Sequence, residues 1–339
     1  QVSTFHSFGL KILRENYSYL GYNSNFTIID SDDTLTIIKR ILKEENLDSK
    51  IYNPSAIKNK ISGCKNELVE PNEYEKYAAS DFEKVVLKIY EKYQNKLKQN
   101  NSVDFDDLLV LPIKLFKSHS EILDAYQERF KYILIDEYQD TNKSQFTLVT
   151  MLAAKYGNIT VVGDNDQGIY SFRGADIDNI LSFTKDFPSQ DGKEAKLFKL
   201  EQNYRSTQTI VEAANSLIHH NRNQIQKEVF SKNDKGEKIL YKPAYSDKEE
   251  ALIVAKNIQR IKRQDDCGYD QFAILYRTNA QSRSFEEEFR KQGIPYRIYG
   301  GLSFYQRKEI KDIIAYFRLV ANPDDEEAFK RIINYPARG

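Results

Sequence analysis

The chain has 339 residues, 50 basic against 50 acidic side chains, and 40% hydrophobic residues. This length accommodates two or more domains, since roughly 100–200 residues is the usual domain size, and the composition excludes wholesale disorder. The charge balance excludes a uniformly basic nucleic-acid-binding domain, so any nucleic-acid site must be a local groove.

The two cysteines, Cys64 and Cys267, form neither a C-x-x-C pattern nor a His-rich cluster, which argues against a disulfide framework or a zinc site and favours a reducing compartment. No apolar run approaches the roughly 18–20 residues that a membrane-spanning helix needs. The chain starts at Gln1, without an initiating Met or the layout of a signal peptide. We expect a piece of a longer cytoplasmic protein with no membrane partner.

Helical spacing of apolar residues begins the chain, at 4–19. The character changes from residue 21 to about 102, where helical patterns at 32–45 and 81–99 are rich in Lys, Glu and Tyr and are separated by Asn53-Pro54 and Glu70-Pro71. We predict that residues 21–102 form an all-helical insertion in a first domain made of 1–20 and 103–190.

The first domain continues with helices at 105–117 and 121–131, a strand at 132–135, a helix at 143–156 and a second strand at 159–162. The run Y-I-L-I at 132–135 has no polar alternation, which is typical of a parallel strand buried on both faces. Strand, polar turn and helix recur in this order, and we therefore predict an α/β fold with a doubly wound parallel sheet.

A polar linker at 187–193 precedes a second α/β domain, predicted over 191–339. Its strands are expected at 196–200, 272–276 and 296–298, with a charged hairpin-like stretch near 232–241. Its helices are expected at 207–219, 247–263, 280–292, 308–320 and 325–334.

Two adjacent carboxylates, Asp136 and Glu137, follow the strand at 132–135 directly. The carboxyl ends of parallel strands are where open α/β sheets bind ligands. In nucleotide hydrolases this place holds an Asp that binds Mg²⁺ and an acid that orients or deprotonates the attacking water. The structural alternative is a strand leading into a helix, with Asp136 or Asp140 as N-cap and Glu137 in the first turn.

A second polar turn, V-V-G-D-N-D-Q-G-I-Y-S-F-R-G-A-D at 161–176, ends the next strand. Gln167 is a neutral donor placed to reach a phosphate oxygen. Tyr170, Phe172 and Arg173 combine flat rings with a cation, as single-stranded nucleic-acid sites do. The alternative is that the two rings are buried by the following helix.

A third stretch, L-E-Q-N-Y-R-S-T at 200–207, precedes a helix. Here Tyr204 is placed to stack on a base and Arg205 to act as an arginine finger on a transferring phosphoryl group. A lone Arg after a strand is otherwise a surface residue.

These three motifs, in this order and spacing, resemble the superfamily-one DNA helicases of the UvrD/PcrA/Rep group. The resemblance extends over nearly the whole chain, including T-F-H-S-F at the start, A-I-L-Y-R-T-N-A-Q-S-R at 273–283 and Y-G-G-L-S-F at 299–304. It implies two RecA-like domains that close on ATP and reopen after hydrolysis, with an alternating grip that moves the protein along single-stranded DNA.

The resemblance assigns an ATP site with Mg²⁺. Asp136 would bind the metal ion and Glu137 would be the base for water, while Gln167 would sense the γ-phosphate. Tyr204 would stack on adenine, and Arg205 would contact the γ-phosphate across the cleft.

It also assigns contacts to single-stranded DNA and to junctions of single and double strands. The implied DNA-binding residues are Thr4, His6, Tyr170, Phe172, Arg173, Asn279 and Ser303. Phe172 stands where several relatives carry Trp, and Ser303 where some carry a DNA-contacting Lys, which would weaken the grip modestly. The resemblance places the helical insertion over the duplex junction and names no protein partner.

The phosphate-binding loop of the family, G-x-x-x-x-G-K-[ST], is absent, because Gly192-Lys193 is followed by Glu194 and lacks the first glycine. The family's later motifs, with a further arginine for the γ-phosphate, are also absent. We therefore expect no detectable ATP hydrolysis by this chain alone. A steady ATPase rate that is lost on Glu137→Gln would overturn this expectation.

Three functions remain open at this point. The first is a fragment of a 3′-to-5′ DNA helicase or translocase in repair or replication, favoured by the segments at 273–283 and 299–304. The second is a fragment of a helicase–nuclease subunit, which shares the motifs. The third is a non-hydrolysing module that binds single-stranded DNA or another protein.

Overall fold

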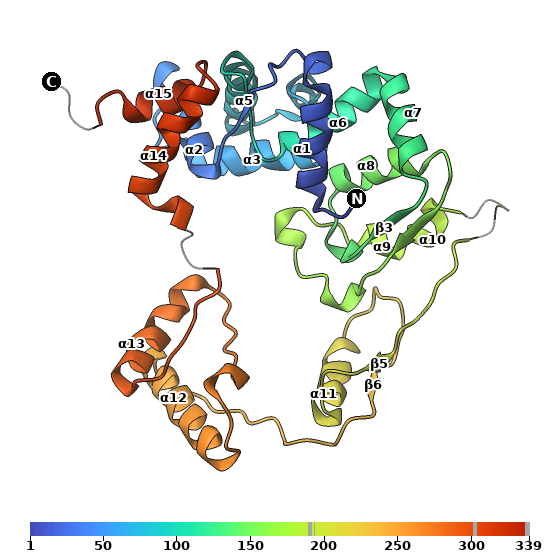
Figure 1. The fold of residues 1–339 in the computed structure, drawn as a ribbon, viewed down its shortest axis with the longest axis vertical. Helices are drawn as coiled ribbons and strands as arrows, with labels where there is room; N and C mark the ends of the chain where they lie inside the picture. Colours follow the sequence, from blue (N-terminus) through green and yellow to red (C-terminus); the bar gives the residue numbers. More distant parts are fainter. Residues whose placement is uncertain (189–191, 193, 301–303, 336–339) are drawn as a thin grey trace.

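A computed structural model describes residues 1–188, 192, 194–300 and 304–335. The fold is α/β, with many helices and three short parallel strand pairs among these residues. The first half of the chain forms a helical part and the sheet with β3, and α14 and α15 at the end of the chain return to helices of the first half (Figure 1). No helix in the described ranges is both long and apolar enough to span a bilayer.

Helix α1 (Phe5–Asn16) crosses α6 (Asp107–Ser118) at close range because a glycine lies at the crossing. A β-carbon on Gly9 would lie 1.9 Å from the carbonyl oxygen of Leu108. The four helices predicted around this core are confirmed as α1, α6, α7 (Ser120–Arg129) and α8 (Lys143–Ala153). Their shared core contains Ile12, Leu109, Phe116, Tyr126 and Leu148.

The two strands predicted in this part are confirmed as β3 (Ile133–Ile135) and β4 (Ile159–Val161), which pair in parallel. Helices α8, α9 (Asp178–Leu181) and α10 (Phe183–Asp186) pack on them through a core cluster around Ile135, Tyr138 and Phe183. This packing fixes the strand ends that carry the polar turns.

The prediction that the first strand is buried on both faces is wrong. Leu134 is 78% exposed and Tyr132 is 75% exposed. Successive side chains of a strand point to opposite faces, and the described helices cover the face that carries Ile135. The apolar run correctly indicated a strand, but it did not establish that both faces are covered.

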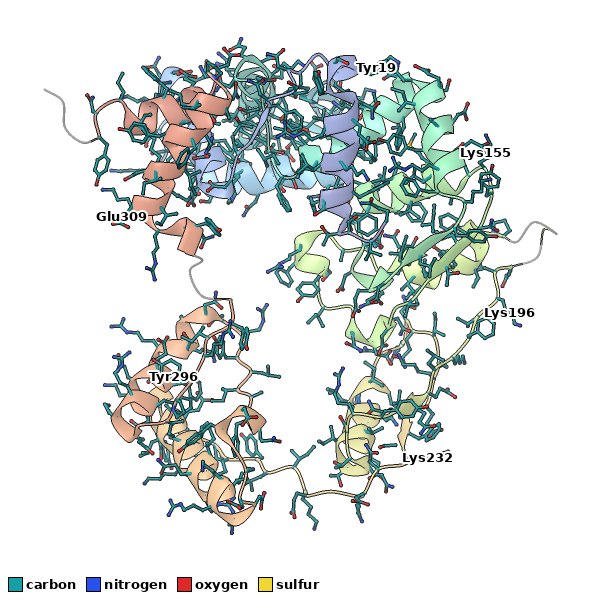
Figure 2. The ribbon with its side chains drawn as sticks, viewed as in Figure 1. Tyr19, Lys155, Lys196, Lys232, Tyr296 and Glu309 are labelled. Carbon is teal, nitrogen blue, oxygen red and sulfur yellow. The ribbon has the colours of Figure 1, made fainter. Side chains whose placement is uncertain are left out.

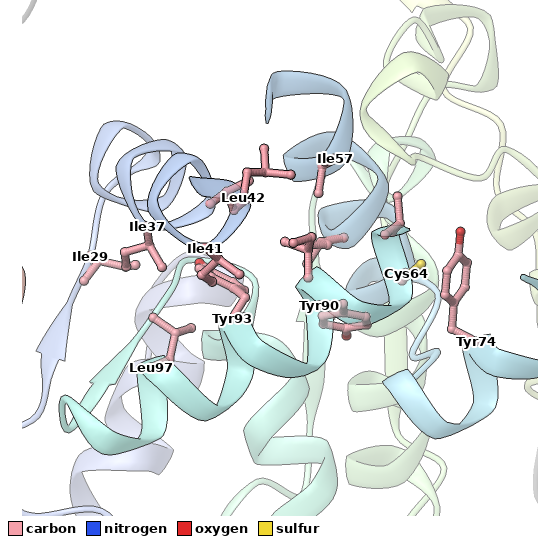
Figure 3. Close-up of a cluster of buried hydrophobic side chains, with 14 residues drawn as sticks. Ile29, Ile37, Ile41, Leu42, Ile57, Cys64, Tyr74, Tyr90, Tyr93 and Leu97 are labelled. Atoms are coloured by element: carbon pink, nitrogen blue, oxygen red, sulfur yellow. The ribbon is translucent and has the colours of Figure 1, made fainter. Parts of the chain in front are cut away.

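The predicted helical insertion contains α2 (Ser31–Glu44), α3 (Pro54–Asn66), α4 (Pro71–Tyr74) and α5 (Asp81–Gln99). Local signals start these helices: Asp30 accepts from two backbone N–H groups of α2, and Ser80 forms a capping box with Glu83 at α5. The helices enclose a core that includes Ile37, Ile41, Ile57, Tyr90, Tyr93 and Leu97 (Figure 3).

The insertion is not entirely helical, which corrects the prediction. Its ends pair as two-residue parallel strands, β1 (Thr27–Ile28) and β2 (Ser102–Val103). The insertion also contains the 3₁₀ turn η2 (Glu75–Tyr77). Other 3₁₀ turns outside it are η1 (Tyr17–Leu20), η6 (Tyr269–Gln271) and η8 (Phe304–Gln306).

A buried ionic cluster joins α3 to α6. The Lys65 ammonium lies 2.6 Å from Asp104 Oδ2 and 2.8 Å from Asp107 Oδ1, and Tyr93 donates to Asp104 at 2.9 Å. Burial alone would lower the pKa of Lys65, but the two carboxylates outweigh it and the pKa is raised. Since loss of one partner would leave a buried charge unpaired, this cluster fixes how the insertion sits on α6.

In the second half, the predicted helices are confirmed as α11 (Gln208–Ile218), α12 (Asp247–Gln264), α13 (Ser282–Gln292), α14 (Lys308–Ala321) and α15 (Glu326–Ile332). The strands are not where they were predicted. The stretches at 196–200, 272–276 and 296–298 are not strands, and no hairpin forms at 232–241.

The strands of the second half are instead β5 (Gln202–Asn203) and β6 (Phe230–Ser231), paired in parallel. A strand needs a neighbour to take its backbone hydrogen bonds, and the described residues provide none for the predicted stretches. Leu275, in the middle of one of them, is 95% exposed. The apolar pattern was therefore insufficient to locate these strands.

Helices α14 and α15 dock on the insertion through polar contacts that the sequence did not indicate. Arg318 lies 2.6 Å from Asp33 Oδ2 and 2.9 Å from Asp325 Oδ2. Arg40 lies 2.5 Å from Glu327 Oε1. The buried Asn322 amide donates to two backbone carbonyls, those of residues 100 and 101, at 3.1 and 3.2 Å.

Candidate functional site

The two polar turns predicted from the sequence lie side by side at one end of the β3–β4 pair. The strand ladder continues past the strands, because Val162 N–H donates to the Ile135 carbonyl at 2.8 Å and Tyr138 N–H donates to the Val162 carbonyl at 3.0 Å. These bonds place the turn that begins at Asp136 beside the turn that begins at Gly163.

Asp136 and Glu137 are both exposed at this end. Glu137 has a φ of 51°, in the left-handed region, and its N–H donates to Asp136 Oδ1 at 2.9 Å. Left-handed backbone is uncommon for a residue other than glycine, and such positions cluster at functional sites. Among the described residues no group of three or more His, Cys, Asp or Glu side chains is arranged to hold a metal ion.

A single exposed carboxylate nevertheless fits the chemistry of Mg²⁺ in a nucleotide site. Mg²⁺ keeps several waters and is held by one or two carboxylates together with phosphate oxygens, so it needs no cage of protein ligands. Asp136 could supply one such ligand.

A buried glutamine joins the two turns. The Gln139 side chain donates to Glu137 Oε2 at 2.7 Å, and its Oε1 accepts from the Asp164 N–H at 3.0 Å. Gly163 leaves room for it, since a β-carbon there would lie 2.6 Å from Gln139 Oε1. The Glu137 carboxylate is therefore held by the turn (η3, Tyr138–Asp140) that also contacts the second polar turn.

The neighbouring Asp140 has a raised pKa, caused first by burial and then by the charge of Glu137. Its buried Oδ1 accepts no hydrogen bond among the described atoms. A carboxyl group in this setting favours its protonated form more than an exposed one does.

The second turn (η4, Asn165–Gln167) holds the Gln167 side chain on Asp164, with Gln167 Nε2 donating to Asp164 Oδ2 at 2.8 Å. Lys227, which precedes β6, contacts Asp164 Oδ1 and lies 3.0 Å from Asp166 Oδ2. Burial alone would raise the pKa of Asp164, but hydrogen bonds from Lys227 and Gln167 outweigh it and the pKa is lowered.

The aromatic pair lies in the next turn (η5, Ser171–Arg173). Phe172 is 63% exposed, and its ring centroid is 6.0 Å from that of Tyr170. The Arg173 guanidinium lies 5.2 Å from the Tyr170 ring and 5.4 Å from the Phe172 ring. Arg277, from the second half of the chain, lies 5.6 Å from the Phe172 ring. Exposed rings between two arginines are suited to stacking on bases.

Thr4 and His6 have structural partners. Thr4 caps α1 by accepting from the Ser7 N–H at 3.3 Å. The His6 ring stacks on Phe105 with 4.0 Å between centroids, and burial lowers the pKa of His6. Both positions lie at the start of α1, and Thr4 remains exposed.

Tyr204 and Arg205 lie in an exposed turn after β5, and Tyr204 is 79% exposed. Asn203 Oδ1 shapes this turn by accepting from the N–H groups of Arg205 and Ser206 at 3.0 and 2.8 Å. Among the described residues, the cation that pairs with the second polar turn is Lys227 rather than Arg205.

Two further DNA-contact predictions remain. Asn279 is exposed at the start of η7 (Asn279–Gln281), where its carbonyl accepts from the Ser282 hydroxyl at 2.9 Å. Ser303 lies outside the described residues.

The sequence analysis missed four residues of this region: Gln139, Asp164, Lys227 and Arg277. Asp164 is within the quoted motif at 161–176, and Gln139 follows Glu137 by two residues, so their polar type at a strand end was the available signal. Lys227 and Arg277 lie in stretches with no motif of their own, so only their contacts reveal them.

Comparison with known proteins gives matches along almost the whole chain. Residues 1–188 match the family model described as UvrD/REP helicase N-terminal domain, and residues 198–339 match the UvrD-like helicase C-terminal domain. The chain is 50% identical over 338 residues to the ATP-dependent DNA helicase PcrA of Bacillus subtilis and 46% identical to that of Leuconostoc citreum. These alignments cover 100% of this chain but 45% and 44% of the two relatives, so the chain spans less than half of their length.

Proposed function

Because the chain belongs to the UvrD-like helicase family, we propose that it is part of an ATP-dependent DNA helicase or translocase that moves 3′ to 5′ along single-stranded DNA. We assign residues 1–20 and 103–190 to one RecA-like motor domain, 191–339 to a second, and 21–102 to an insertion that contacts the duplex junction. We also propose that the protein acts in DNA repair or replication and that it is cytoplasmic.

The single observation that carries the proposal is the hydrogen-bonded connection between the two polar turns. Gln139 bonds to Glu137 on one side and to the backbone of Asp164 on the other. Gln167 lies three residues after Asp164, and the Tyr170–Phe172 pair follows in the same loop. Groups suited to phosphate chemistry and groups suited to base stacking are thereby connected within one short segment.

In this function Glu137 is the general base. Its Oε2 is held by Gln139 at 2.7 Å, which orients the carboxylate and leaves Oε1 for a water molecule. Asp136, exposed beside it, would hold Mg²⁺, and Gln167 would contact the terminal phosphate of ATP. Bound Mg²⁺ stabilises the charge that develops on the phosphates during transfer.

Tyr204 and Arg205 complete the nucleotide site in this proposal, with Tyr204 stacking on adenine and Arg205 contacting the γ-phosphate. Both are exposed and lie on the second half of the chain. An arginine on the second half of the chain would act across a domain boundary, and closure of the two domains on ATP would bring it to the phosphate.

In this proposal the DNA contacts are Tyr170, Phe172 and Arg173, and the further contacts are Thr4, His6, Asn279 and Ser303. Stacking on an aromatic side chain contributes about 1–3 kcal/mol per base. A helicase–nuclease subunit is not favoured, because the relatives that match this chain throughout are named DNA helicases.

Binding of fluorescent single-stranded DNA across a salt series tests the proposal. We expect salt-sensitive binding that weakens roughly 5-fold to 150-fold in Tyr170→Ala and in Phe172→Ala, the range that the loss of one stacked base predicts. Tyr245→Ala is the matched control, since Tyr245 is a fully exposed tyrosine in the second half of the chain. Folded protein that does not bind, or variants that bind as tightly as the parent, would contradict the proposal.

A further inference from the structure

Lys227 makes an ionic contact that connects the second half of the chain to the turn carrying Gln167. It lies 63 residues from Asp164 in sequence, and its ammonium contacts that carboxylate and lies 3.0 Å from Asp166 Oδ2. The Lys227 side chain is only 16% exposed, and those of Asp164 and Asp166 are 31% and 14% exposed. Partly buried pairs are screened less by salt than surface pairs.

The two carboxylates depend on this cation. Asp164 and Asp166 belong to one turn, where the Asp166 N–H donates to Asp164 Oδ1 at 3.0 Å. Two like charges this close repel each other unless a cation lies between them. Among the described residues, Lys227 is the cation that contacts both of them, and the hydrogen bonds that it donates to Asp164 and Asp166 raise its pKa despite its burial.

The same Asp164 carboxylate holds Gln167. Its Oδ2 accepts from Gln167 Nε2 at 2.8 Å, while its Oδ1 faces Lys227. The backbone of Asp164 donates to Gln139, which in turn donates to Glu137. A change at Lys227 can therefore affect Gln167 through the Asp164 carboxylate. It can affect Glu137 through Asp164 and then through the side-chain amide of Gln139.

We propose that Lys227 is a positioning residue that fixes the turn at residues 164–167 against the β6 segment, so that the Gln167 amide stays on Asp164 while the two segments are in contact. When the β6 segment moves away, Asp164 and Asp166 lose their shared cation and the turn releases Gln167. The position of the second half of the chain thus determines whether Gln167, the side chain that contacts phosphate, is held on Asp164. This inference rests on the proposed function, which supplies the role of Gln167.

The side-chain amide signals of Gln167, followed by NMR in the 339-residue chain and assigned with Gln167→Glu, test this inference. We expect Lys227→Met to move these signals to the position of glutamines whose amide bonds only to water and to speed their hydrogen exchange about tenfold, as for loss of a hydrogen bond to a charged acceptor. Lys227→Arg should restore the parent signals, because a bidentate cation can span both carboxylates. Lys232→Met, at an exposed lysine just after β6 (Figure 2), is the matched control and should leave them unchanged.

Asp166→Asn is a second variant that weakens the contact from the side of the turn, and it should shift the Gln167 signals in the same direction. Circular dichroism and thermal unfolding of each variant verify that it is folded. Gln167 signals that are the same in folded Lys227→Met and in the parent would overturn the inference, as would a shift that Lys227→Arg fails to restore. Failure of the proposed function would appear separately, as DNA binding unchanged in Tyr170→Ala and Phe172→Ala.

Discussion

At the scale of single residues, Asp106 is a carboxylate whose surroundings disfavour its charge. It lies beside the buried cluster of Lys65, Asp104 and Asp107 at the start of α6. Burial and the charge of Asp104 raise its pKa to about 6, although Ser62 donates a hydrogen bond to it and Lys65 is near. Its ionised form at neutral pH therefore destabilises the fold.

We predict that Asp106→Asn stabilises the chain at pH 7 by about 3 kcal/mol, since burial raises the pKa by roughly two units above its ordinary value and each unit corresponds to ~1.4 kcal/mol. A folded-state pKa above the unfolded value means that the penalty is present above about pH 6 and is relieved as the pH falls toward 4. Urea unfolding at pH 7 and at pH 4 measures this. A stability difference that persists undiminished at pH 4 would show that the charge is not the cause.

The sequence predicted part of the site residue by residue. Asp136, Glu137 and Gln167 could be identified as candidates because a carboxylate or amide directly after an apolar strand is a local pattern. Lys227 could not, because its contact depends on two segments 63 residues apart in the chain. Long-range ionic contacts leave no periodic signal in the sequence.

At the scale of elements, the crossing of α1 and α6 depends on the missing side chain of Gly9. We predict that Gly9→Ala destabilises the chain by about 1–3 kcal/mol, the usual cost of overpacking, because the new β-carbon would overlap the Leu108 carbonyl. Gly63→Ala, within α3, is the matched control. A β-carbon there meets no atom within 4 Å, so this variant should stabilise by roughly 0.5–1 kcal/mol through helix propensity.

Thermal and urea unfolding of both glycine variants measure these changes. Equal effects of the two substitutions would indicate that the crossing tolerates a methyl group and that only helix propensity matters.

Helices were predicted better than strands for a physical reason. A helix satisfies its backbone hydrogen bonds within its own segment, and caps such as Asp30 and Ser80 can be recognised from the sequence. A strand depends on a partner from elsewhere. The stretch at 272–276 has the expected composition but no neighbouring strand among the described residues, so it forms none.

At the scale of the whole molecule, α14 and α15 join the end of the chain to the insertion mainly through charges. Asp325 is buried and pairs with Arg318, which also pairs with Asp33 of α2. We predict that Arg318→Ala destabilises this docking by about 3 kcal/mol, because it leaves a buried carboxylate unpaired.

Hydrogen exchange followed by mass spectrometry measures this effect locally. Amides of α14 and α15 should exchange faster in Arg318→Ala, while those of α12 should not change. Arg283→Ala is the control, since Arg283 makes an exposed pair within α13. Uniformly faster exchange throughout the chain would instead indicate global destabilisation.

The contact between Arg318 and Asp33 spans 285 residues. During synthesis at roughly 5–20 residues per second, α2 would be completed about 15–60 seconds before its partner helices exist. An apolar docking face would be exposed to other unfolded chains for that whole time. The face of α2 that receives Arg318 and Lys311 carries Asp30, Asp32 and Asp33 instead, which remain hydrated until the last helices arrive. Because this contact surface is polar, α2 can wait in water for α14 and α15 to be synthesised and can still bind them.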